Sequence, residues 1–216
     1  MEYVVDVYWS MRSPFCYLAL DRILALEQEH DITVAIKHVW PGAMRSKGYF
    51  KALNPNYPGY HTRDASRLAE FLNIPYARPK PDPLAFDKTT MEPLALAEQP
   101  HIGQLTRMAL LAVEKGMGTS YLNTVMRLIW NGVQENWHDR NNLAGAVVAA
   151  GLDFNELADR AEAEANRLDA IIDRNNHNLS SVGHWGVPCS VFRGEPFFGQ
   201  DRLTLLNWRL DQVRKY

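Results

Sequence analysis

The chain has 216 residues, of which 46% are hydrophobic, so it can bury a sizeable core, and disordered and fibrous classes are excluded. It has 23 lysine and arginine residues against 25 aspartate and glutamate residues, which gives a formal net charge of −2. This balance leaves no basic stripe for a phosphate backbone, so nucleic acid is not expected as a partner.

Two features predict a cytoplasmic protein. The only cysteines are Cys16 and Cys189, so no disulfide framework holds the fold together, and a reducing compartment fits this composition. The first ten residues lack a basic region followed by a long apolar stretch and a small-residue cleavage site. No run approaches about eighteen apolar residues, so no membrane association is expected.

The chain opens with a pattern typical of a β-α-β unit. Residues 2–9 are rich in β-branched and aromatic side chains, which predicts a buried strand. Ser13 and Pro14 then form a typical helix start, because serine is a preferred N-cap and proline fits the first helical position. A helix to about Glu29 and a second strand over residues 32–39 complete the unit, whose crossover is nearly always right-handed.

The middle of the chain, residues 40–178, has a helical texture. Asp153 followed by Glu156 resembles a capping box, and it predicts one long helix that continues through Ile172. The proline-rich residues 75–83 predict an irregular connection. Apolar residues recur at helical spacing in four further segments, which begin after Asp64, Gly103, Ser120 and Asn142.

The end of the chain returns to strand texture. Residues 188–192, a turn at Arg193 and Gly194, and a short strand near Phe198 predict a hairpin, and a last helix begins near Asp201. The predicted fold class is therefore α/β: a thioredoxin-like domain (β-α-β followed by β-β-α) with a large all-helical insertion. We place the thioredoxin-like domain at residues 1–42 and 179–216, and the helical insertion at residues 43–178.

The corner at Ser13 is the first candidate for chemistry. Thioredoxin-like redox enzymes carry Cys-x-x-Cys at this position, whereas this chain has serine first and Cys16 last. The free N–H groups of a helix N-terminus favour an anion beside that hydroxyl. Dithiol exchange within the corner is impossible. The alternatives are a plain N-cap for Ser13 and a small buried apolar side chain for Cys16.

Two loops near the C-terminus are further candidates. In thioredoxin-like folds a cis-proline stands opposite the helix corner, and the preceding residue offers its backbone N–H and C=O to an extended thiol substrate. Val187 and Pro188 have the matching position, although by themselves they form only a turn. Residues 198–202 (FGQDR) enter the last helix, where backbone donors and polar side chains suit an α-amino-carboxylate group; alternatively they form a simple capping loop.

Three runs resemble one family. Residues 6–19 (DVYWSMRSPFCYLA), 185–192 (WGVPCSVF) and 198–203 (FGQDRL) are similar to the 2-hydroxychromene-2-carboxylate isomerases and kappa-class glutathione transferases of the DsbA-like group. Residues 60–64 (YHTRD) and Trp130 also match family positions, so the resemblance covers nearly the whole chain. It implies a glutathione-dependent isomerase that acts on an intermediate of aromatic compound degradation.

The resemblance also implies roles for individual residues. The family serine matches Ser13, and Val187 ahead of cis-Pro188 would pair its backbone with the cysteinyl part of glutathione. The remaining matches are Gln200 and Asp201 for the γ-glutamyl end, Asn54 for a glutathione-binding asparagine, and Tyr60 and Trp130 for the substrate pocket, although both aromatic residues could equally fill the core. Family members are usually homodimers.

A serine hydroxyl is physically adequate for this role. Lowering a thiol pKa from about 8.5 to about 7 requires about 2 kcal/mol of preferential thiolate stabilisation. A hydrogen bond to a charged group supplies roughly 1.5–3 kcal/mol, and a helix N-terminus adds about 0.3–1 kcal/mol. Ser13 is therefore expected to donate a hydrogen bond to the glutathione sulfur without acting as a nucleophile.

The sequence departs from the family pattern around the acceptor side, at Ser10, Arg12, Cys16 and Cys189. Arg12 could attract a thiolate or an acidic substrate, or it could be a solvated loop residue. Three alternatives to the isomerase stay open: a kappa-like glutathione transferase, a DsbA-like thiol oxidoreductase and a binder without turnover. The seven histidines show no paired metal spacing, so no metal site is expected.

Overall fold

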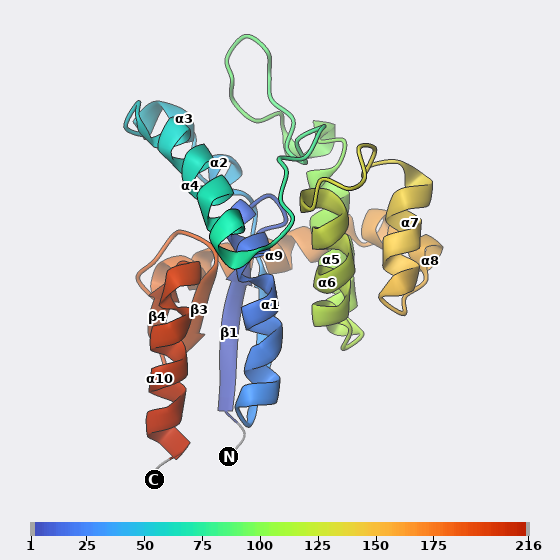
Figure 1. Ribbon diagram of the computed structural model, residues 1–216. Coiled ribbons are helices and arrows are strands. Elements are labelled where there is room, and N and C mark those ends of the chain that lie inside the picture. The colour runs from blue at the N-terminus through green and yellow to red at the C-terminus, as the bar shows by residue number, and fades with distance from the viewer. Residues whose placement is uncertain (1–2, 215–216) are drawn as a thin grey trace.

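A four-stranded mixed sheet forms the centre of the protein. The computed structural model describes residues 3–214, and in it the strands lie in the order β2-β1-β3-β4 (Figure 1). β1 (Tyr3–Trp9) pairs in parallel with β2 (Ile32–His38) and antiparallel with β3 (Cys189–Phe192), which pairs with β4 (Glu195–Phe198). The predicted β-α-β and β-β-α segments therefore meet in one sheet.

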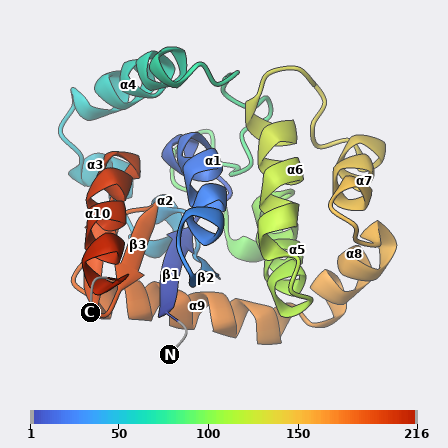
Figure 2. The same ribbon diagram turned by 60° about the horizontal axis from the view of Figure 1, so that its bottom comes forward.

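The helix after β1 begins and ends where the sequence predicts. α1 (Pro14–Glu29) has Ser13 as its N-cap, Pro14 in its first turn and a C-cap at His30. β2 follows as expected, while the first residue of the predicted 2–9 strand lies outside the described residues. α1 and the last helix, α10 (Leu203–Arg214), lie side by side over one face of the sheet (Figure 2).

The C-terminal hairpin is also confirmed. Arg193 and Gly194 both have positive φ, 52° and 80°, as the tight turn between β3 and β4 requires. A short 3₁₀ helix, η2 (Gln200–Arg202), precedes α10, so the regular helix begins at Leu203, two residues after the predicted start at Asp201.

The middle of the chain is helical, as predicted. α4 begins earlier than expected, at Tyr57, and residues 75–83 are an irregular connection without a helix or strand. The helices before the predicted long one are α2 (Gly42–Arg45), α3 (Tyr49–Ala52), α4 (Tyr57–Leu72), η1 (Leu96–Glu98), α5 (Ile102–Glu114), α6 (Gly118–Trp130) and α7 (Arg140–Ala149).

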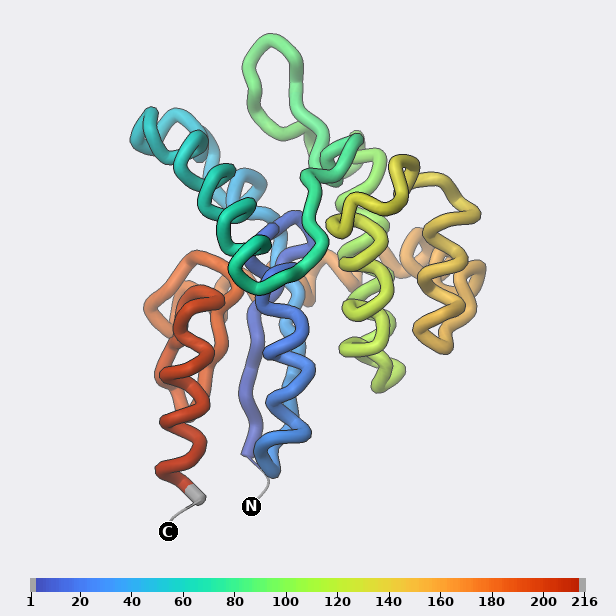
Figure 3. The backbone as a smooth tube through the Cα atoms, viewed as in Figure 1, coloured from blue at the N-terminus to red at the C-terminus, as the bar shows by residue number. Residues whose placement is uncertain are grey.

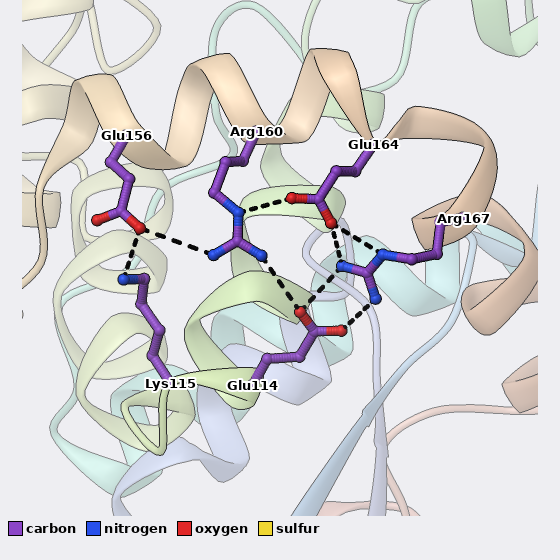
Figure 4. A network of polar contacts seen from close by, with 6 residues as sticks. All are labelled: Glu114, Lys115, Glu156, Arg160, Glu164 and Arg167. Atoms are coloured by element: carbon purple, nitrogen blue, oxygen red, sulfur yellow. Dashed lines mark hydrogen bonds and ion pairs between the residues drawn. The ribbon is translucent and has the colours of Figure 1, made fainter.

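The prediction of one long helix after Asp153 is wrong. Asp153 does cap a helix, because its side chain accepts the Glu156 N–H at 3.0 Å, but α8 (Phe154–Ala163) ends at Glu164 and α9 (Ala165–Ser181) begins there. Glu164 accepts hydrogen bonds from Arg160 and Arg167, and both arginines also contact Glu114 of α5 (Figure 4). α8 and α9 both pack against α5, and the contacts of Glu114 with the two arginines connect the turn to that helix.

α9 covers the second face of the sheet. It lies on the side of the sheet away from α1 (Figure 2), and its residue Leu179 is buried in a cluster with Tyr8, Cys189 and Val191. The larger core lies between the other face, α1, α10 and the helices of the middle segment. We keep the division at residues 42 and 179 as a proposal, with α9 packing on both parts.

The segment between α4 and α5 passes over the N-terminal end of α1 and then projects outward before α5 (Figure 3). The Tyr17 hydroxyl of α1 donates to the Pro75 carbonyl at 2.6 Å, and the projecting loop closes through a bridge between Phe86 and Pro93. The N-terminus of α1 is thus enclosed by segments that are remote in the sequence.

Candidate active site

A cavity of about 480 Å³ lies at the N-terminal end of α1. The residues before and at the start of α1 form one part of its wall. The rest is formed by the loop before β3, the loop before η2, the helices α2 to α4 and the segment that follows α4. It brings together most of the residues that the sequence predicts for the site: Arg12, Ser13, Tyr60, Trp130, Val187, Gln200 and Asp201.

Ser13 is partly exposed at the cavity wall, and its hydroxyl has one role already assigned. Its Oγ accepts the Cys16 N–H at 3.2 Å, and its own N–H donates to the Ser10 carbonyl at 3.1 Å. Because the oxygen accepts, the hydroxyl hydrogen is left to donate. The Ser13 hydroxyl can therefore cap the helix and donate a hydrogen bond to a ligand at the same time.

The loop before β3 has the predicted conformation. The Val187–Pro188 peptide bond is cis, and the Pro188 carbonyl accepts the Gly199 N–H at 2.9 Å. Val187 lines the cavity, and its N–H and C=O have no hydrogen-bond partner within residues 3–214. Pro188 itself is not part of the wall, so the backbone of Val187 is what this loop offers to a ligand.

The short helix η2, with Gly199 before it, supplies polar groups at another part of the wall. Gly199 has a φ of 97°, a backbone conformation that strongly favours glycine. Gln200 is half-buried, whereas Asp201 is exposed and pairs with Arg202 at 2.8 Å. One amide and one carboxylate thus face the same end of the cavity.

Arg12 is neither a solvated arginine nor a free cation. Its Nε and Nη2 donate to the two carboxylate oxygens of Asp82 at 2.7 and 2.8 Å, and its guanidinium lies over the Phe86 ring. The side chains of Arg12 and Asp82 are 19% and 35% exposed, so the pair is partly shielded from water. The arginine fastens the segment after α4 to the corner that carries Ser13.

We expect Arg12→Met to destabilise the fold by about 1–3 kcal/mol, because Asp82 would keep a half-buried charge without its partner. The double variant Arg12→Met/Asp82→Asn removes both charges, and we expect the pKa of a thiol bound at Ser13 to equal the wild-type value there. Urea unfolding and thiolate absorbance measure the two effects. A raised thiol pKa in the double variant would show that Arg12 acts directly on the sulfur.

The two aromatic candidates differ in their surroundings. Tyr60 of α4 is 54% exposed at the cavity mouth, whereas Trp130 is 3% exposed. The Trp130 Nε1–H donates to the Met11 carbonyl at 3.1 Å, and its indole ring stacks between Tyr17 and Tyr76. Trp130 therefore supports the corner more than it presents a surface to a ligand.

The structure does not bring Asn54 to the cavity. This residue lies in the exposed connection between α3 and α4, and its Oδ1 accepts the Asn56 N–H at 2.9 Å. Asn54 is not part of the cavity wall, so the glutathione-binding role that the resemblance implies for it finds no support in its position.

Among the cavity residues that the sequence analysis gave no role, three have basic side chains: Arg45, His61 and Arg78. Arg45 donates to the Trp40 carbonyl at 2.9 Å and Arg78 donates to Thr62 Oγ1 at 2.9 Å, and neither pairs with a carboxylate within residues 3–214. His61 lines the same cavity, and burial together with the charges of Arg78 and Arg12 lowers its pKa, which favours the neutral imidazole. No local motif marks Arg45 or Arg78, whereas His61 lies in the run 60–64 that matches family positions but has no role assigned to it there.

Both cysteines are fully buried. Burial raises the pKa of Cys16 to about 12 and that of Cys189 to about 11, although the Ser10 backbone and the Ser13 hydroxyl oppose the shift at Cys16. The thiolate is the nucleophilic form of cysteine, so neither side chain is prepared for exchange in this conformation.

The raised pKa of Cys16 predicts a pH effect on stability. The unfolded thiol ionises near pH 9 and the folded one only near pH 12, so its contribution is present below pH 9 and is lost as the pH rises above it. We expect wild type to lose more unfolding free energy between pH 8 and pH 10.5 than Cys16→Ala does. Urea unfolding at the two pH values measures this, and equal losses would contradict the shift.

No helix within residues 3–214 is long and apolar enough to cross a membrane. No group of three or more histidine, cysteine, aspartate or glutamate side chains in that range is placed to hold a metal ion.

Comparison with solved structures shows the fold. The chain superposes on 2-hydroxychromene-2-carboxylate isomerase with a TM-score of 0.73 at 19% identity, covering 98% of this chain and 96% of that one. A probable DsbA oxidoreductase from Streptomyces coelicolor gives 0.65 at 17% identity, with 99% and 91% covered. The cytosolic disulfide reductase DsbM from Pseudomonas aeruginosa, solved with GSH, gives 0.58 at 16% identity, with 96% and 99% covered.

Comparison with curated protein sequences gives no significant match. A family model does match, that of the DSBA-like thioredoxin domain, over residues 4–211. This range includes every strand of the sheet apart from the first residue of β1, and it includes the whole cavity wall. The chain belongs to the DSBA-like thioredoxin domain family.

Proposed function

We propose that the chain is a glutathione-dependent isomerase of the 2-hydroxychromene-2-carboxylate type. One observation carries the proposal: a single cavity contains the Ser13 hydroxyl, the unpartnered backbone of Val187, and the polar side chains of Gln200 and Asp201. These groups match, in order, a thiol, a peptide backbone and an α-amino-carboxylate group. Glutathione contains all three.

The corner at α1 suits a thiolate. The Cys16 N–H that donates to Ser13 Oγ polarises the hydroxyl and strengthens the hydrogen bond that it donates in turn. The sulfur would also lie at the N-terminus of the 16-residue α1, where the helix dipole favours negative charge. Together these two effects supply the roughly 2 kcal/mol that ionisation at neutral pH requires.

The rest of the wall suits the ends of the tripeptide and an anionic acceptor. Asp201 would bind the ammonium group of the γ-glutamyl residue, and Gln200 would bind the α-carboxylate of the same residue. Arg45 and Arg78 line the cavity without a carboxylate partner within residues 3–214, so an acidic ligand would find unneutralised cations there. Tyr60 at the mouth would contact a flat aromatic substrate.

The isomerisation requires only the substrate and glutathione as reactants. The hemiketal ring of the chromene first opens: the ring C–O bond breaks, the hydroxyl proton passes to the phenol oxygen, and the hemiketal carbon becomes a ketone. The glutathione thiolate then adds to the double bond conjugated with this ketone and forms a C–S bond, and the electron pair moves to the ketone oxygen as an enolate. The former double bond is now single and rotates. The enolate then re-forms the double bond in its new geometry and expels the thiolate, so nothing is oxidised and glutathione is recovered.

A glutathione transferase would use the same activated sulfur on an electrophile, with the conjugate as product. A thiol oxidoreductase would need an exchangeable protein thiol, and both cysteines here are buried with raised pKa values. The relative solved with GSH supports a glutathione site in this fold without choosing among the three reactions. The homodimer and the cytoplasmic location stay predictions.

The deciding experiment incubates the chain with glutathione and three substrates in parallel: a 2-hydroxychromene-2-carboxylate, an electrophilic chlorodinitrobenzene, and insulin. The isomerase proposal predicts glutathione-dependent interconversion of the chromene and its ring-opened form, with the glutathione concentration unchanged. Consumption of glutathione into a conjugate would assign the transferase reaction instead. Reduction of insulin that is abolished by Cys16→Ala would assign thiol exchange.

A further inference from the structure

Arg22 joins α1 to the loop that carries Gln200. Its Nη1 donates to the backbone carbonyl of Gln200 at 2.8 Å, and its Nη2 donates to the side-chain Oε1 of the same residue at 2.5 Å. Nη2 also lies 3.3 Å from the Leu18 carbonyl, one turn earlier in α1. The half-buried guanidinium of Arg22 therefore donates to both the backbone and the side-chain oxygen of Gln200, which lies 178 positions away in the sequence.

This contact decides how the Gln200 amide faces the cavity. A guanidinium has only donors, so the amide atom beside it must be the oxygen, and the NH₂ group must point elsewhere. Those two N–H donors have no acceptor within residues 3–214, and Gln200 is part of the cavity wall. The acceptor of the amide is therefore occupied by Arg22, and its two donors, which suit a carboxylate, are left for a ligand.

Arg22 itself is outside the cavity wall and forms no ion pair with a carboxylate within residues 3–214. Burial lowers its pKa, while the charge of Asp201 opposes that shift, so a carboxylate is near without pairing. The same helix carries Ser13 at its N-terminus. α1 therefore positions the Ser13 hydroxyl directly and the Gln200 amide through Arg22.

We infer that Arg22 is a positioning residue that fixes the Gln200 amide, so that its NH₂ group receives the α-carboxylate of a γ-glutamyl ligand. The inference rests on the proposed glutathione function and adds a specificity determinant to it. The fork of the guanidinium is essential, because an ammonium group cannot bond both oxygens in this fixed geometry. Arg22 acts through Gln200 and does not touch the ligand.

The test measures glutathione binding by calorimetry in wild type, Arg22→Met, Gln200→Ala and the double variant. We expect each single change to weaken glutathione about tenfold, and the double variant to bind no more weakly than Gln200→Ala, because both remove the same hydrogen bond. The pKa of the bound thiol should stay at its wild-type value. Cysteinylglycine, which lacks the γ-glutamyl group, should bind wild type and Arg22→Met equally.

Two controls separate positioning from general damage. Arg127→Met removes another arginine that contacts α1, through Asp21, and it should leave glutathione affinity unchanged. Arg22→Lys keeps the positive charge but cannot form the two parallel hydrogen bonds of a guanidinium, so it should bind glutathione as weakly as Arg22→Met. If the methionine variant fails to fold, the lysine variant still tests the role of the guanidinium.

The outcomes are distinct. Wild-type affinity in Arg22→Met or Arg22→Lys, with weak binding in Gln200→Ala, would overturn the role of Arg22 and leave the proposed function intact. An equal loss for cysteinylglycine would assign Arg22 a purely structural role and also overturn the inference. Failure of wild type to bind glutathione at all would overturn both proposals.

Discussion

Ser13→Ala is expected to lower glutathione-dependent turnover by about 10- to 100-fold. The substitution removes a hydrogen bond to a charged sulfur, worth about 1.5–3 kcal/mol, and each 1.4 kcal/mol corresponds to about a tenfold change in rate. The free N–H groups of α1 remain, so activity should fall without vanishing. Steady-state kinetics at saturating glutathione measures the effect.

The same substitution removes a helix cap, and two variants separate that loss from the loss of the donor. Glycine at an N-cap costs only a few tenths of a kcal/mol, so Ser13→Gly should lose activity like Ser13→Ala with a smaller loss of stability. Asp153→Ala removes the matching cap of α8, where the side chain accepts the Glu156 N–H, and should cost about 1 kcal/mol without affecting turnover. Wild-type turnover in Ser13→Gly would contradict the role of the hydroxyl.

Trp130→Ala should have the largest effect on stability among the residues at the site, about 3–5 kcal/mol. The indole is almost fully buried between Tyr17 and Tyr76, so its removal leaves a cavity, and the Met11 carbonyl loses its donor. Met11 lies in the loop that ends at Ser13, so the catalytic corner should loosen as well. Urea unfolding measures the stability change.

Trp130→Phe is the matched control, because it keeps an aromatic ring in the stack and removes only the N–H donor. We expect it to cost about 1–2 kcal/mol and to retain most of the turnover. If Trp130→Ala left stability near that of wild type and raised only the KM of the aromatic substrate, the residue would be a pocket surface, as the family resemblance implies.

Local patterns were sufficient for most of the fold. The Ser13–Pro14 start and the apolar spacing after it define α1, and the paired turn residues Arg193 and Gly194 define the hairpin, because in each case the determinants are neighbours in sequence. The break at Glu164 has no glycine or proline to mark it. It accompanies the packing of α8 and α9 on α5 and the contacts of Glu114 with two arginines, which only the fold brings together.

The site was predictable to the extent that its residues lie in short motifs. Ser13, Val187 and Gln200 each stand at a loop that enters a helix or strand, and the structure places all three on one cavity wall. The partners that fix them are remote: Asp82 is 70 positions from Arg12, and Arg22 is 178 positions from Gln200. Side-chain pairs of this kind have no periodicity or spacing that a single sequence could show.

The most direct test of the account follows the thiolate absorbance of bound glutathione as the pH is raised, in wild type and in Ser13→Ala. The account predicts that wild type lowers the thiol pKa from about 8.5 to about 7 and that Ser13→Ala returns it most of the way to the solution value. An unshifted pKa in wild type, or the same lowered pKa in both proteins, would contradict it.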